Sequence, residues 1–175
     1  TKILIILRNQ IDWLLSAYGN FVLHKGNLSF KEWFNLYGKL LHEKLKFSNL
    51  IHRYIDLFGI KNINVLTYEN LFDPNNGIGF FLKENFSLNI KNKKKMKKIN
   101  SGRSLFLNET IAKLNKFIPS SYYSKLFRQK TLYRKNNIEK KFVQNILIRN
   151  QLNFRKENEK ICKLLNINLP NVYFE

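Results

Sequence analysis

An arginine and a serine near the start of the chain are spaced so that they could bind one anion. Arg8 follows an apolar run directly, and Ser16 comes eight residues later. Eight residues are about two turns of an α-helix, so both side chains could converge on one ligand. A guanidinium supplies permanent charge and bidentate hydrogen bonds, and a hydroxyl adds a neutral donor. The pair suits a phosphate monoester, although an arginine paired with a nearby acid and a solvent-facing serine are the commoner arrangement.

A buried strand and an amphipathic helix are predicted to position this pair. Residues 2–7 are a continuous aliphatic and β-branched run, which indicates a strand buried on both faces. Apolar side chains then recur every three or four residues from 11 to 21, as on one face of a helix. In an open α/β sheet, ligands bind beyond the carboxyl ends of the strands. Residues 1–21 are therefore predicted to form a strand-helix unit with Arg8 at the ligand-binding end.

The rest of the chain alternates predicted helices with a second strand. Ser29 and Glu32 have the spacing of a capping box for a helix from Phe30 to about Lys46. Another helix ends near Gly59, and residues 62–68 indicate a second buried strand. Further amphipathic helices are predicted at about residues 105–117, 138–149 and 154–165. This order predicts a parallel α/β sheet flanked by helices, with a helical C-terminal part.

The composition predicts one basic globular domain over residues 1–175. The chain is 44% hydrophobic and 14% aromatic, with a net charge of +19. Such a charge suits a polyanionic partner, but it is also what a lysine-rich solvated surface gives. Residues 91–104 are predicted to form a basic loop, because KNKKKMKK places six lysines in eight positions.

No apolar run is long enough for a membrane span, so we expect a cytoplasmic chain. The single cysteine, Cys162, is predicted to be a buried structural thiol.

Several strings of the sequence resemble those of sulfotransferases. ILIILRNQIDWLLSAY is similar to the family's 3′-phosphate-binding strand and helix, which read Arg-Asn-Pro, an acidic position and Ser-x-Tyr. Gln10 stands where the family has a proline that stiffens the turn but supplies no ligand. NINVLTYENLFDP resembles the family's valine-rich strand followed by Tyr-Glu-Asp-Leu, with Asn70 in place of the aspartate. SFKEWFNLYGKLL resembles its acceptor-side helix, and RKENEKICKLLNINLP its closing helix. The resemblance covers most of the chain except roughly residues 120–150.

The resemblance implies transfer of a sulfuryl group from 3′-phosphoadenosine 5′-phosphosulfate to a hydroxyl or amine of an acceptor. The acceptor would be a carbohydrate or a small alcohol, and no metal is needed. The implied fold has three layers like that of P-loop NTPases. Arg8 and Ser16 would bind the donor's 3′-phosphate, and Gly102 and Arg103 would close over it from a later loop. Tyr68 would contact the donor or, together with Glu69, tie the strand end to its neighbours.

Two parts of the family's catalytic machinery are not found in the sequence. The Lys/Arg-x-Gly-x-x-Ser/Thr phosphosulfate loop and the catalytic base would precede Thr1, so we expect an N-terminally truncated domain that is inactive alone. The histidines at positions 24, 42 and 52 are interpreted as structural.

Two other functions remain open. A nucleic-acid-binding module could use the lysines of SSYYSKLFRQKTLYRK and stack bases on Tyr122, Tyr123 or Tyr133. A non-catalytic remnant could bind adenosine 3′,5′-bisphosphate or nothing at all.

Overall fold

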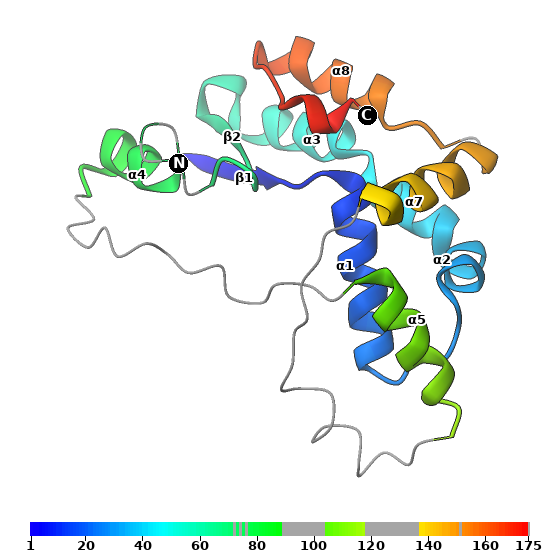
Figure 1. The fold of residues 1–175 in the computed structure, drawn as a ribbon. Coiled ribbons are helices and arrows are strands. Elements are labelled where there is room, and N and C mark those ends of the chain that lie inside the picture. The colour runs from blue at the N-terminus through cyan, green and yellow to red at the C-terminus, as the bar shows by residue number, and fades with distance from the viewer. Residues whose placement is uncertain are drawn as a thin grey trace. The chain divides into compact units, whose positions relative to one another are not determined.

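The computed structural model describes residues 1–71, 73, 75, 77–88, 104–117, 137–150 and 152–174 (Figure 1). These residues form two compact units that alternate along the chain. The first unit comprises Thr1–Gln10, Leu45–Lys97 and Asn153–Glu175, and the second comprises Ile11–Lys44 and Lys98–Leu152.

The first unit contains a parallel pair of strands. Its elements are β1 (Ile3–Leu7), α3 (Phe47–Phe58), the 3₁₀ turn η1 (Ile60–Asn62), β2 (Ile63–Thr67), α4 (Ile78–Phe86), α8 (Arg155–Leu165) and the 3₁₀ turn η2 (Asn171–Tyr173). The register pairs Ile3 with Ile63 and Leu7 with Thr67. Both predicted strands and their parallel pairing are therefore confirmed. Within the described residues the sheet has only these two strands, so a full three-layer sheet of the P-loop type is not present there.

One face of the sheet packs on the core of the first unit. Ile5 and Leu7 are buried in a cluster that includes Ile51 of α3 and Ile161 of α8. These two helices lie against each other beside the strands (Figure 1). Successive strand side chains point to opposite faces, and Ile6, which points away from this cluster, is 45% exposed. The expectation that β1 is buried on both faces is therefore wrong at Ile6.

The ends of the helices in the first unit follow the local sequence signals. Gly59 terminates α3 with φ 77° and ψ 144°, a conformation that residues with a side chain rarely adopt. Asn166 ends α8 in the left-handed region, as a C-terminal cap often does. Cys162 has a free thiol and is only partly buried against the apolar cluster, rather than fully buried as expected.

The second unit is helical and has an aromatic core. Its helices are α1 (Gln10–Leu23), α2 (Phe30–Leu45), α5 (Leu105–Leu114) and α7 (Asn137–Arg149), where α1 and α2 each have one terminal residue in the first unit. Tyr18 and Phe30 are fully buried, and their rings meet edge to face with centroids 5.2 Å apart. The predicted capping box is confirmed, because the Ser29 N–H donates to Glu32 Oε2 at 2.8 Å and the Glu32 N–H donates to Ser29 Oγ at 3.3 Å.

Candidate anion-binding site

Arg8 and Tyr68 meet where the two strands leave the sheet. Because Leu7 and Thr67 are register partners in a parallel pair, the residues after them emerge at the same edge. The Tyr68 N–H donates to the Leu7 carbonyl at 2.6 Å, which extends the pairing by one residue. The guanidinium carbon of Arg8 lies 5.1 Å from the centroid of the Tyr68 ring, within the range of a cation–π contact. Two of the predicted site residues are thus brought together.

The guanidinium of Arg8 has no acidic partner among the described residues. The ion pairs in this part of the chain join other side chains, including Lys160 with Glu157 and Arg155 with Glu159. The side chain is partly buried, and its contact with the ring of Tyr68 uses none of its N–H groups as hydrogen-bond donors. A guanidinium carries five N–H donors in a planar fork, which matches the oxygens of a phosphate. Arg8 can therefore bind an oxyanion at the sheet edge.

The turn after Arg8 is fixed by a buried pair of side-chain amides. Gln10 Nε2 donates to Asn158 Oδ1 at 2.7 Å, and Asn158 Nδ2 donates to Gln10 Oε1 at 3.2 Å. Gln10 is 2% exposed, and Asn158 is fully buried. Burying two amides is favourable only when their donors and acceptors are satisfied, as they are in this reciprocal pair. The turn after Arg8 is therefore stiffened by a side-chain contact to α8.

The residue after Tyr68 is tied to the C-terminal segment. The Tyr173 hydroxyl donates to Glu69 Oε2 at 2.9 Å, and the Tyr173 carbonyl accepts from Asn158 Nδ2 at 2.7 Å. This contact supports the interpretation that Glu69 ties the strand end to its neighbours. Tyr68 itself faces Arg8, so it lies at the candidate site whether or not it contacts a ligand.

Three other predicted site residues are not placed together with Arg8. Ser16 lies on α1 with an exposed side chain, and it belongs to the second unit whereas Arg8 belongs to the first. Its convergence with Arg8 on one ligand stays a prediction. Gly102 and Arg103 lie outside the described residues, as do most of the basic loop predicted at residues 91–104 and the three tyrosines of the nucleic-acid hypothesis.

The sequence did not single out Thr67 or Asn158. Thr67, at the end of β2, is 6% exposed, and its hydroxyl has no hydrogen-bond partner in the described part of the chain. The sequence did hold one signal for Thr67. It is a polar residue after an apolar run, near the carboxyl end of a predicted strand. Asn158 lies in a strongly charged helix, where the sequence offers no sign that one amide is buried.

The histidines have ordinary structural surroundings. His52 Nδ1 lies 2.8 Å from the Ser48 carbonyl one helical turn earlier, and His42 lies 3.7 Å from Glu43. His24 is exposed at the end of α1. None of these contacts gives a histidine the surroundings of a general base.

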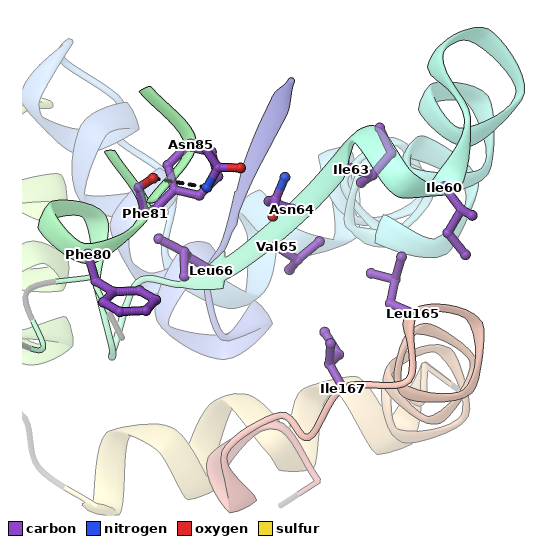
Figure 2. Close-up of a pocket in the computed structure, with 10 residues that line it drawn as sticks. All are labelled: Ile60, Ile63, Asn64, Val65, Leu66, Phe80, Phe81, Asn85, Leu165 and Ile167. Carbon is purple, nitrogen blue, oxygen red and sulfur yellow. Dashed lines mark hydrogen bonds between the residues drawn. The ribbon is translucent and has the colours of Figure 1, made fainter. Parts of the chain in front are cut away.

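A pocket of about 320 Å³ lies in the first unit beside β2, and Figure 2 shows its lining. Leu165 contributes from the end of α8, Ile167 from the segment that follows it, and Phe80 and Phe81 from α4 (Figure 2). Neither Arg8 nor Tyr68 lines the pocket. Apart from Asn64 and Asn85 its side chains are apolar, and Asn85 Nδ2 already donates to the Phe81 carbonyl at 3.0 Å. The pocket therefore does not suit a phosphate, and the strand ends beside Arg8 remain the candidate anion site.

The described residues hold no group of three or more His, Cys, Asp or Glu side chains that could bind a metal ion. No helix in the same part of the chain is long and apolar enough to cross a membrane. The chain matches none of the family models, curated proteins or solved structures with which it was compared. The resemblance to sulfotransferases therefore depends on the quoted strings of the sequence alone.

Proposed function

We propose that this chain binds the 3′-phosphate of 3′-phosphoadenosine 5′-phosphosulfate, as part of a sulfotransferase whose acceptor is a carbohydrate or a small alcohol. The observation that carries the proposal is the position of Arg8. It is partly buried at the carboxyl end of a parallel strand, lies over Tyr68, and has no acidic partner among the described residues. This is where α/β proteins bind phosphate groups.

Arg8 and Ser16 have different roles in this proposal. Arg8 supplies the charge and the bidentate hydrogen bonds, and Ser16 adds a neutral hydroxyl from α1. Gly102 and Arg103 close over the same phosphate, with glycine permitting close approach of the backbone. Tyr68 holds the guanidinium of Arg8 and borders the bound nucleotide.

Sulfuryl transfer requires more than this half of the donor site. It is an in-line displacement, similar to phosphoryl transfer, in which charge on the transferred group is neutralised and a base deprotonates the acceptor. The sequence contains no Lys/Arg-x-Gly-x-x-Ser/Thr loop for the phosphosulfate group. We therefore expect nucleotide binding without turnover, and the decisive measurement is of binding.

Calorimetric titration with adenosine 3′,5′-bisphosphate tests the proposal. A hydrogen bond to a charged group is worth roughly 1.5–3 kcal/mol and a neutral one roughly 0.5–1.5 kcal/mol. At ~1.4 kcal/mol per factor of ten, Arg8→Ala should weaken binding by roughly ten- to a hundredfold, and Ser16→Ala should cost less. Binding of adenosine 5′-phosphate, which lacks the 3′-phosphate, should barely change in either variant.

Arg53→Ala is the matched control for charge. Arg53 is exposed on α3 of the same unit, so its removal lowers the net charge equally without touching the strand ends. It should leave both nucleotides' affinities nearly unchanged. Equal losses for the two nucleotides in Arg8→Ala would show that Arg8 holds the fold together rather than recognising the 3′-phosphate. Equal losses in Arg8→Ala and Arg53→Ala would reduce the effect to general electrostatic attraction.

A further inference from the structure

We infer that a circuit of hydrogen bonds through the C-terminal segment, buried at Gln10 and Asn158 and part-buried at Glu69, holds Arg8 over Tyr68 and so sets the affinity of the anion site. Its positioning residues are Gln10, Asn158, Tyr173 and Glu69. The ligand named below rests on the proposed function, but the geometry of the circuit does not.

The first half of the circuit fixes the chain on the Arg8 side. Gln10 follows Arg8 by two residues and begins α1. Two hydrogen bonds between its planar amide and that of Asn158 determine both the position and the orientation of this turn relative to α8. Neither side chain exposes more than 2% of its surface, so water does not compete for these bonds.

The second half fixes the chain on the Tyr68 side. Asn158 Nδ2 also donates to the carbonyl of Tyr173 in η2. Tyr173 is 3% exposed, and its hydroxyl reaches Glu69, the residue directly after Tyr68. The same C-terminal segment therefore holds both chain ends that leave the sheet. The cation–π contact between Arg8 and Tyr68 closes the circuit.

Positioning of this kind affects binding through entropy. A free arginine side chain samples many rotamers, and ordering it on a ligand opposes binding. A guanidinium already held over an aromatic ring loses less freedom when an anion arrives. Loosening the circuit should therefore weaken binding through Arg8 even though no circuit residue touches the phosphate.

Tyr173→Phe is the sharpest variant, because it removes one hydroxyl and keeps the buried ring. The affinity for adenosine 3′,5′-bisphosphate should fall about three- to tenfold, while that for adenosine 5′-phosphate should stay unchanged. Tyr54→Phe is the control. Tyr54 is partly buried in the same unit, packs its ring on Phe58, and makes no hydrogen bond through its hydroxyl among the described residues. Tyr54→Phe should change the affinity for neither adenosine 3′,5′-bisphosphate nor adenosine 5′-phosphate.

Two substitutions of Gln10 separate positioning from simple stability. Gln10→Ala removes the amide pair and frees the turn, so it should weaken binding of the bisphosphate about tenfold. Gln10→Pro also removes the pair, but proline fixes φ and is well tolerated at the first position of a helix. It should recover most of the affinity while its melting temperature stays as low as that of Gln10→Ala. Affinity that simply follows melting temperature in the two variants would mean that the pair only stabilises the fold.

A ligand-free measurement completes the test. The Nε–H signal of Arg8 in ¹H–¹⁵N spectra, assigned by its loss in Arg8→Ala, should be shifted by the Tyr68 ring current. In Tyr173→Phe it should move toward the position of an exposed arginine, and in Tyr54→Phe it should not move. An unchanged signal in Tyr173→Phe overturns the circuit, whatever the nucleotides do. If the signal moves but the wild-type chain does not bind the bisphosphate, the positioning is supported and the proposed function is wrong.

Discussion

Asn158→Ala should be among the most destabilising substitutions in the first unit. The side chain is fully buried and makes three hydrogen bonds, two with Gln10 and one with the Tyr173 carbonyl. Its removal takes a hydrogen-bond partner from three buried polar groups, and the loss at each costs about 1–3 kcal/mol. Taking the low end for each group, because the chain relaxes around the change, the loss is about 3 kcal/mol.

A double-mutant cycle with Gln10→Ala separates this loss into its parts. Gln10→Ala leaves only part of the Asn158 amide unpaired and should cost roughly 1–2 kcal/mol. In the double variant both amides are gone, so of these three hydrogen bonds only the one to the Tyr173 carbonyl is lost while its acceptor remains. The single variants sum to about 4–5 kcal/mol and the double variant should lose about 1 kcal/mol, so the double variant should be about 3–4 kcal/mol less destabilised than that sum.

Urea denaturation followed by circular dichroism measures these free energies. Asn62→Ala is the matched control, because the Asn62 side chain makes one exposed hydrogen bond, to the Phe58 carbonyl at 2.7 Å. It should cost less than about 1 kcal/mol. Losses that add to within about 0.5 kcal/mol would refute the reasoning, since they would show that the two amides do not depend on each other.

Two further predictions concern glycine and pH. Gly59→Ala should destabilise the fold by about 1–3 kcal/mol because φ is 77°, whereas Gly79→Ala in α4 should stabilise it by about 0.5–1 kcal/mol. Both sites have open space around an added Cβ, so thermal melts that shift in the same direction for the two variants would contradict a backbone origin. Burial opposes ionisation of Glu157, but hydrogen bonds from Lys160 and Ser48 outweigh it and lower the pKa of this carboxyl. A lowered folded-state pKa gives stability that is present above the unfolded value of about 4.3 and is lost as the pH falls through the folded value. Glu157→Gln should therefore melt below the wild type at pH 7, and the gap should close as the pH falls below about 4. A gap that is independent of pH would exclude this origin.

The local elements could be predicted from the sequence because their signals are short in range. An unbroken aliphatic run determines β1, the three-residue spacing of Ser29 and Glu32 starts α2, and Gly59 ends α3. Each signal depends on residues within a turn or two of one another. The parallel pairing was predicted from the sequence, but the second strand was predicted to include Tyr68, and the structure ends it at Thr67 and places Arg8 beside Tyr68.

The tertiary structure alone decided which polar groups are buried and what they bind. Gln10 and Asn158 pair across 148 positions of the chain, and Tyr173 reaches Glu69 across 104. Asn158 belongs to RKENEKICKLL, a string whose polar residues all look solvent-exposed. Likewise, Ile6 reads as buried in its aliphatic run and is exposed. Periodicity shows which residue types alternate, but whether a face is covered depends on helices that come from distant parts of the sequence.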